Sequence, residues 1–361
     1  MIRLPLHQLK PGMVLAMPLY GPDGVVLLNS GVTLKSAYIQ RLHELGFSGA
    51  YVRDGVADDI PLDTPITEQT RAFAMAAVRQ VVQELQQDSA LPHLGKVRKA
   101  VNSILDDLLS HQGVMVGLTQ VRATDDYTFA HSVDVGVMAL IAGIAMGLSR
   151  PRLIDLGMGA LLHDVGKTQV NRPILTKPGP LTPAESESMK LHTVYGFDML
   201  RGRRDISAVA AHVAYEHHER NDGSGYPRGL REAKIHPLAQ VVAVVDVFDA
   251  MTSDRPYRRG LPAHEAARYL TRTKGRLFSV VAVERFLARL PLYPTGTVVA
   301  LNTGELALVI AQNSADRTRP VVRLLAAPGG RPFKRPVDID LLTDRDRTIT
   351  EISRWDPPLR G

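Results

Sequence analysis

The sequence contains no cysteine. This absence excludes disulfide bonds and thiolate metal sites, and it is typical of a reducing compartment. The longest purely apolar stretch, residues 135–148, has 14 residues and is shorter than the ~18 that a membrane-spanning helix needs. The first residues also lack the charged and then apolar pattern of a signal peptide. We therefore expect a cytoplasmic protein without a membrane segment.

Long runs of one charge are missing as well. The formal net charge is +6, but the basic residues are interspersed with acidic ones, so the sequence does not indicate a nucleic acid polymer as a partner. A small anionic ligand is compatible with this charge. The chain has 361 residues, of which 45% are hydrophobic and 22% charged, and this is enough for two or three ordinary globular domains.

The pattern of apolar residues changes along the chain and divides it into four parts. We predict, in order, a small α+β N-terminal module in residues 1–60, a linker with packing helices in 61–113, an all-helical domain in 114–290 and a β-rich domain in 291–361. The predicted fold class is therefore mainly α, with small modules at both ends.

Shorter patterns predict individual elements. We expect strands at 12–16, 24–28, 50–52, 296–301, 306–311 and 321–325, and helices at 36–45, 68–87 and 97–109. Thr182 and Glu185 form a capping box that opens a helix, which places His192 about two turns along it. His7 and His43 have no partners at ligand spacing, so we expect structural or surface roles for them.

The helical region contains a histidine and an aspartate side by side at the end of an apolar run. One doublet says little, because buried polar residues are often satisfied by hydrogen bonds. More histidines and another aspartate lie before and after it, within apolar helical patterns. The candidate ligands are His131, His163, Asp164, His192, His217, His218 and Asp246. They are too many for one metal ion.

These residue types point to a two-metal site. Imidazole and carboxylate groups bind divalent first-row metals, and Asp164 has two oxygens with which to bridge two ions. Two ions about 4 Å apart clamp both oxygens of an in-line displacement and supply a hydroxide at neutral pH. Lys167 follows Asp164 by three residues and so lies on its side of the helix, in reach of a phosphate oxygen, whereas His163 points elsewhere. We expect Asp164 and Lys167 to catalyse phosphoester hydrolysis.

Other residues near the ligands have two interpretations. His212 lies five residues before His217 and off the ligand face, which favours a structural role. The loop Gly225-Tyr226-Pro227 is either a simple helix stop or part of the site. Arg255 and Arg258 follow the helix that carries Asp246, and we favour bidentate phosphate capture over ordinary surface charge.

With these residues assembled, the helical domain resembles the HD-GYP family, a subgroup of HD-superfamily phosphohydrolases that hydrolyse the bacterial messenger cyclic di-GMP. Three segments carry the resemblance: HDVGK at 163–167, HHERNDGSGYP at 217–227 and DVFDAMTSDRPYR at 246–258. The resemblance implies an HD-type, metal-dependent phosphodiesterase that uses a metal-bridging hydroxide to convert cyclic di-GMP to pGpG, with GMP as a further product left open.

The resemblance also implies a role for each matching residue. The metal ligands of the family fall on the seven positions found above, and its ions are typically iron or manganese. Its substrate-phosphate contacts fall on Lys167, Asp249, Arg255 and Arg258. Gly225, Tyr226 and Pro227 correspond to the loop that gives the family its name and is associated with substrate access and protein partners.

One position departs from the family pattern. Some members place a glutamate four residues before the first histidine, as a ligand for a third metal ion, and that position is Tyr127 here. A phenol with a pKa near 10 is a poor ligand at neutral pH. We therefore predict two metal ions and slow conversion of pGpG to GMP, unless Asp125 or Asp126 compensates.

Two alternatives from other classes stay open. A cyclic-dinucleotide sensor that acts on partner proteins would have slow turnover, but the complete ligand set argues against it. A di-iron redox sensor suits histidine-rich sites with carboxylate bridges, but Lys167 and the arginines have no use in redox chemistry. The sequence leaves open the metal, the preferred cyclic dinucleotide and the oligomeric state, with a homodimer as one option.

Overall fold

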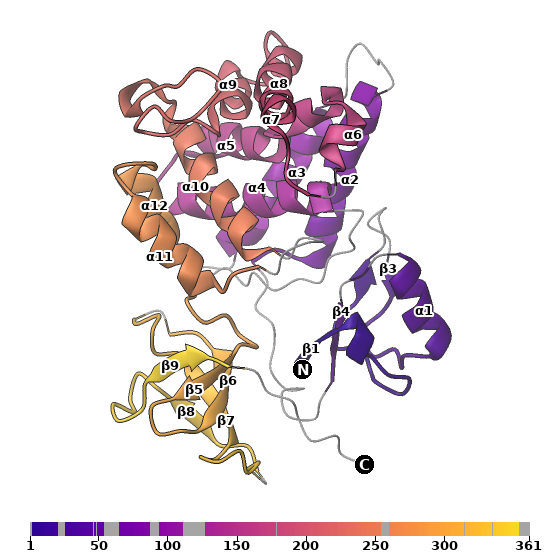
Figure 1. Ribbon diagram of the computed structural model, residues 1–361, viewed down its shortest axis with the longest axis vertical. Helices are drawn as coiled ribbons and strands as arrows, with labels where there is room; N and C mark the ends of the chain where they lie inside the picture. The colour runs from indigo at the N-terminus through magenta and orange to yellow at the C-terminus, as the bar shows by residue number, and fades with distance from the viewer. Residues whose placement is uncertain are drawn as a thin grey trace.

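The computed structural model describes residues 2–20, 26–45, 47, 49–53, 65–86, 94–110, 127–177, 179–253, 260–313, 315–333 and 335–353. Two predicted phosphate contacts, Arg255 and Arg258, lie outside these ranges, as do Asp125 and Asp126. Helices dominate the chain, and short strands lie toward its two ends (Figure 1). The predicted fold class, mainly α with a small β-rich C-terminal part, is confirmed.

The body of the protein is a group of helices around one continuous apolar core. The helices predicted at 68–87 and 97–109 are α2 (Glu68–Gln86) and α3 (Gly95–Ser110). The following helices are α4 (Tyr127–Ala145), α5 (Arg150–Leu162), α6 (Arg172–Leu175), α7 (Pro183–Lys190), α8 (His192–Leu200), α9 (Ala208–Glu216), α10 (Pro237–Thr252), α11 (Ala263–Thr273) and α12 (Val280–Leu287). Within the described ranges, none is long and apolar enough to span a membrane.

Glycines set the spacing of the helices that lead to the site. A Cβ atom on Gly136 of α4 would lie 2.7 Å from Leu161 of α5. A Cβ atom on Gly159 of α5 would lie 2.6 Å from Val213 of α9. Since side chains at these positions would overpack the core, glycine allows α4, α5 and α9 to approach closely. The histidines at or near their ends are thereby brought together.

The helix predicted to begin after Thr182 is shorter than expected. The reciprocal hydrogen bonds between Thr182 and Glu185 complete the predicted capping box. However, α7 ends at Lys190 and α8 begins at His192. The His192 ring nitrogen Nδ1 lies 2.7 Å from the carbonyl oxygen of Met189, and such side-chain bonds compete with the helical pattern. His192 therefore starts a helix instead of lying two turns inside one.

The N-terminal module contains α1 (Ser36–Glu44), as predicted, and two small antiparallel sheets. The sheets pair β1 (Ile2–Pro5) with β4 (Gly49–Val52) and β2 (Leu19–Tyr20) with β3 (Val26–Leu28). The strand expected at 12–16 is reduced to single bridges at Val14 and Leu15, because these residues pair with different segments. His7 and His43, which have no partners in the sequence pattern, line one open groove of about 640 Å³.

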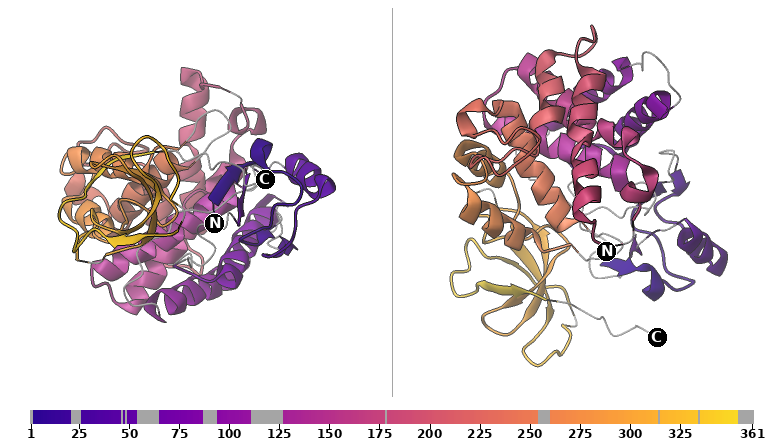
Figure 2. Two further views of the ribbon diagram at one scale, coloured as in Figure 1. Left: turned by 90° about the horizontal axis from the view of Figure 1, so that it is seen from below. Right: turned by 45° about the horizontal axis from the view of Figure 1, so that its top comes forward.

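The C-terminal part is a five-stranded antiparallel sheet in the order β8-β7-β6-β5-β9. Its strands are β5 (Val298–Leu301), β6 (Leu306–Ala311), β7 (Val321–Ala326), β8 (Asp338–Asp340) and β9 (Ile349–Ile352). The first three confirm predicted strands, and the last two carry too few apolar residues to show a strand pattern. Figures 1 and 2 show this sheet next to α11 and α12, apart from the N-terminal strands.

A buried ion pair joins α2 to α4. Arg71 Nη1 lies 2.7 Å from Asp134 Oδ1, and the side chains are 11% and 6% exposed. Removing one partner of a buried ion pair costs about 3–5 kcal/mol. We expect Asp134→Ala to lower the free energy of unfolding by about that amount, measured by urea denaturation followed by circular dichroism.

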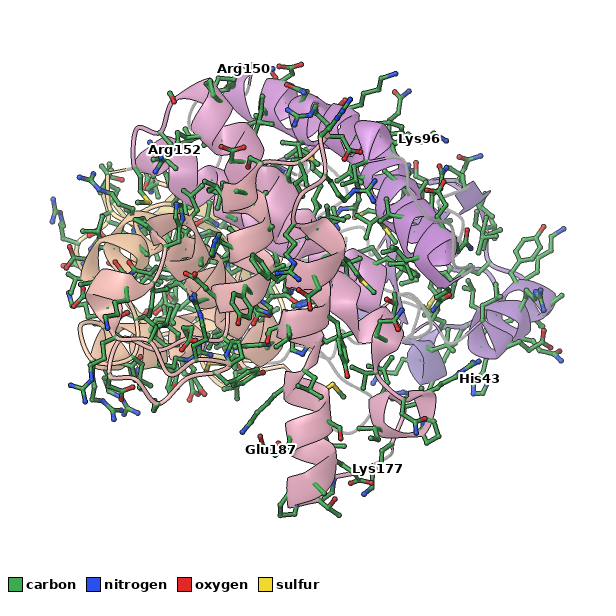
Figure 3. The ribbon with its side chains drawn as sticks, turned by 90° about the horizontal axis from the view of Figure 1, so that it is seen from above. His43, Lys96, Arg150, Arg152, Lys177 and Glu187 are labelled. Carbon is green, nitrogen blue, oxygen red and sulfur yellow. The ribbon has the colours of Figure 1, made fainter. Side chains whose placement is uncertain are left out.

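Asp106 provides the matched control for this prediction. It lies 2.8 Å from Arg150, but these side chains are 64% and 47% exposed, and Arg150 is on the outer surface (Figure 3). Solvent screening limits such a pair to about 0–1 kcal/mol, so Asp106→Ala should unfold at nearly the same urea concentration as the unmodified protein. Equal losses in both variants would contradict the assignment.

Candidate metal centre

The seven predicted ligands converge from five helices. His131 lies in the second turn of α4, His163 and Asp164 follow the end of α5, His192 begins α8, His217 and His218 follow the end of α9, and Asp246 lies within α10. All except the partly exposed His218 are buried. The sequence pattern predicted that His163 and Asp164 point to different sides of one helix. However, α5 ends at Leu162, so both residues lie beyond the helix and both reach the same centre.

Asp164 stands between two groups of ligands. Its Oδ2 atom lies 3.3 Å from His163 Nε2 and 3.8 Å from His131 Nε2. Its Oδ1 atom lies 3.4 Å from His192 Nε2 and 3.9 Å from His217 Nε2. Each oxygen thus belongs to a separate set of side chains with the spacing of a metal site. This is the arrangement of a carboxylate that can bridge two ions.

Asp246 spans the same two groups from the opposite side. Its Oδ1 atom lies 3.2 Å from His131 Nε2 and 3.9 Å from His163 Nε2. Its Oδ2 atom lies 3.9 Å from His218 Nδ1. The two carboxylates therefore face the histidines on both sides of the centre.

Backbone carbonyl groups orient three of the histidines. The Nδ1 atoms of His163, His192 and His217 lie 2.7, 2.7 and 2.9 Å from the carbonyl oxygen three residues earlier in the chain. A carbonyl oxygen only accepts hydrogen bonds, so the proton must be on Nδ1. The Nε2 lone pair of each ring is left facing the centre, as in a histidine that binds metal.

Asp249 supports the fourth ring. Its Oδ2 atom lies 2.7 Å from His131 Nδ1, and the residue is 2% exposed. The sequence comparison with the family predicted a contact with substrate phosphate for Asp249. The structure places one oxygen of this carboxylate behind His131, where it orients the imidazole and makes it more basic, and the phosphate contact stays a prediction.

The chemistry of the donor set fits divalent metal ions. His163 Nε2 and Asp164 Oδ1 are buried and have no hydrogen-bond partner among the described residues. Buried polar atoms without partners are costly, and a cation bound in each of the two groups would give each atom a partner. Nitrogen and oxygen donors without sulfur suit first-row transition ions such as iron and manganese.

Burial and neighbouring charges keep most of the candidate ligands in the protonation state that binds metal. Burial lowers the pKa of His192 and His217, and it lowers the pKa of His218 to about 3. Burial acts to raise the pKa of Asp164, but Lys167 and His163 outweigh it and hold this pKa well below its usual value. These groups are therefore neutral imidazoles and a carboxylate at neutral pH.

His131 differs from the other histidines. Burial acts to lower its pKa, but its hydrogen bonds to Asp246 and Asp249 outweigh that effect and raise the pKa to about 9. Without a metal ion, this imidazole carries a proton at neutral pH. The proton must leave before Nε2 can act as a ligand.

Gly166, in the segment after the doublet, brings α8 to the centre. A Cβ atom at this position would lie 2.0 Å from the carbonyl oxygen of His192 and 2.4 Å from the amide nitrogen of Gly196. Only glycine allows this approach of the two backbones. The sequence showed this glycine only as part of a motif, and its physical role depends on a contact between distant segments.

Lys167 contacts the carboxylate that both ligand groups share, whereas His212 contacts Glu216. Lys167 belongs to a short 3-10 helix (Val165–Gln169), and its Nζ atom lies 2.5 Å from Asp164 Oδ2. The His212 ring points to Glu216, with Nδ1 2.9 Å from Oε1. His212 is thus not among the ligands, in agreement with the sequence pattern.

The loop that contains Gly225, Tyr226 and Pro227 lies against the ligands. The ring centroid of Tyr226 is 4.7 Å from that of His218 and 6.4 Å from that of His192. Lys190 Nζ lies 5.5 Å from the same ring. Burial raises the pKa of Tyr226, so its phenol stays protonated. The loop is part of the site and not only a helix stop.

Comparisons with known proteins agree with this geometry. Residues 104–279 match the family model described as HD domain, and residues 298–354 match the KOW domain associated with HD domain. A cyclic di-GMP phosphodiesterase of Pseudomonas aeruginosa, PA4108, is 36% identical over 251 residues, which are 69% of this chain and 60% of that protein. A cyclic di-GMP phosphodiesterase of Thermotoga maritima is 44% identical over 164 residues, which are 45% of each chain.

A third relative has a different printed substrate. The 3'3'-cGAMP-specific phosphodiesterase 3 of Vibrio cholerae is 36% identical over 146 residues, covering 40% of this chain and 32% of that protein. The matches thus span between 32% and 60% of the length of these relatives. The segment matched by the HD domain model contains the histidines and aspartates assembled above, and the chain resembles HD-GYP proteins in this segment.

Proposed function

We propose that this protein is a metal-dependent phosphodiesterase that hydrolyses cyclic di-GMP to pGpG. The observation that carries the proposal is Asp164, whose two oxygens face separate groups of histidines while Lys167 lies beside it. The names of the relatives from Pseudomonas aeruginosa and Thermotoga maritima support this substrate. The Vibrio cholerae relative makes 3'3'-cGAMP the substrate to compare with it.

The residues of the chain divide the work of the reaction. The inward Nε2 atoms, His218 and the two carboxylates would hold two ions, for which we propose iron or manganese, and such ions would supply activated water at neutral pH and neutralise charge on a phosphate. The Lys167 ammonium stabilises charge on a phosphate oxygen of the substrate. Tyr226 limits the open side of the centre and presents a protonated hydroxyl group. Because Tyr127 replaces a glutamate, we propose slow conversion of pGpG to GMP.

The first prediction concerns the bridging carboxylate. Asp164→Asn removes the charge that both ligand groups share. We expect fewer bound ions per chain and at least about a 100-fold lower rate of pGpG formation, because loss of even an outer partner of a metal site costs about 10–100-fold. Asp155→Asn, in the preceding helix α5, is the control. Metal analysis and chromatography of the nucleotides test both, and full activity of Asp164→Asn would refute the proposal.

A second prediction concerns protons. Since the pKa of His131 is raised to about 9 without metal, ion binding at pH 7.5 displaces about one proton from this ring. Metal affinity therefore rises with pH up to about 9. Calorimetry in buffers of different ionisation enthalpy measures the proton release. Asp249→Asn removes a partner that raises the pKa of His131, so this variant should release fewer protons when the ion binds. Equal proton release by the variant and the unmodified protein would contradict the assignment.

A third prediction separates substrate contact from metal binding. Lys167→Met should retain the metal content of the unmodified protein but lower kcat by about 100-fold, because charge stabilisation in the transition state is lost. Lys177→Met is a matched control. Lys177 is 31% exposed, close to the 28% of Lys167, and its Nζ lies 2.5 Å from Glu185 of α7. Figure 3 labels Lys177 beside the helix that carries Glu187. Unchanged kcat in Lys167→Met would argue against the role.

A further inference from the structure

Glu219 is a buried carboxylate next to the ligand pair His217-His218. It is 2% exposed. Its Oε1 atom accepts a hydrogen bond from the backbone amide of Arg228 at 2.8 Å, and its Oε2 atom accepts one from the amide of Leu230 at 2.8 Å. Both oxygens are therefore used on the segment that follows the loop at 225–227. Hydrogen bonds to a charged acceptor are stronger than neutral ones.

The start of the same loop is held against the same stretch of chain. A Cβ atom on Gly225 would lie 2.4 Å from the amide nitrogen of Arg220 and 2.5 Å from Glu219 Cα. The amide of Tyr226 donates a hydrogen bond to the carbonyl oxygen of His218 at 3.3 Å. The absence of a side chain at Gly225 thus permits direct contact between the two backbones.

These contacts determine where Tyr226 lies. Its ring is tilted by 31° against that of His218, with 4.7 Å between the centroids, and Lys190 approaches it. His218 is the partly exposed ligand, so Tyr226 borders the side on which a substrate would enter. Movement of the loop would move this ring away from the ligand.

Glu216, one turn earlier, has a different task. Its Oε2 atom accepts a hydrogen bond from the amide of His236 at 2.7 Å, directly before α10. Its Oε1 atom lies 2.5 Å from Arg228 Nη2. Glu216 therefore ties α9 to the helix that carries Asp246 and also holds the side chain of Arg228, whereas both oxygens of Glu219 bind backbone amides of the loop segment.

We propose that Glu219 is a positioning residue for substrate binding. Through the amides of Arg228 and Leu230 it holds the loop against His218, so that Tyr226 forms one wall of the substrate opening. The inference rests on the proposed phosphodiesterase function for its kinetic consequence only. Its structural consequence is measurable without substrate.

The test begins with amide hydrogen exchange on the full-length, metal-loaded protein. Glu219→Gln keeps the shape of the side chain but turns an NH₂ group toward one of the two amides. We expect the amides of Arg228 and Leu230 to exchange about tenfold faster or more, because a hydrogen bond to a charged group is lost. Metal content should stay unchanged.

Glu305→Gln is the control for loss of a buried carboxylate. Glu305 is 7% exposed, lies between β5 and β6 of the C-terminal part, and is 3.1 Å from Arg347 Nη2. This variant should leave exchange at 225–230 unchanged. Gly225→Ala disturbs the same contact between the loop and residues 219–220, and it should also make the amides of Arg228 and Leu230 exchange faster. This second variant tests the proposal if Glu219→Gln folds poorly.

Kinetics then separates positioning from a purely structural role. We expect Glu219→Gln to raise KM for cyclic di-GMP about tenfold while kcat changes less than about threefold. Unchanged exchange, faster exchange throughout the helical body, or an unchanged KM would each overturn the proposal. If the unmodified protein does not hydrolyse the nucleotide, the phosphodiesterase assignment fails, and the exchange data still decide whether Glu219 holds the loop.

Discussion

The structure depends on the burial of many polar side chains around one carboxylate. Asp164 and five of its neighbouring ligands are buried, and two inward atoms, His163 Nε2 and Asp164 Oδ1, have no hydrogen-bond partner among the described residues. Such a group is expensive in an apolar core unless a cation binds it. The apolar faces of the surrounding helices form a single core, and the free energy gained by burying these faces offsets the cost of burying the polar groups. Stability and function are therefore coupled at the same place.

The precise approach of backbones makes this cluster possible. Gly136, Gly159 and Gly166 each stand where a side chain would collide with the next element. The ligands then lie mostly at helix ends, where a carbonyl oxygen three residues earlier orients the ring. A helix end offers carbonyl groups that the helix itself does not use. The same feature that ends each helix thus fixes the tautomer of its histidine.

Around this centre, three acidic side chains form hydrogen bonds with other groups of the protein. Asp249 binds the far nitrogen of His131, Glu216 joins α9 to α10, and Glu219 binds the loop at 225–230. Positive charge near the opening comes from Lys167 and Lys190. The carboxylates named here are thus bound to groups of the protein itself, while two ammonium groups lie beside the candidate ligands.

The sequence by itself indicated the candidate ligands, the mainly α class and the family resemblance, because these depend on residue identity, apolar periodicity and long motifs. It also separated His212 from the ligands by helical spacing. It could not reveal the place of Asp249, the contact at Gly166 or the hydrogen bonds of Glu219, since each joins segments distant in the chain or turns a side chain in a direction that spacing does not encode. Only the tertiary structure decided which nitrogen of each ring faces the centre, because backbone carbonyl groups and Asp249 set that choice.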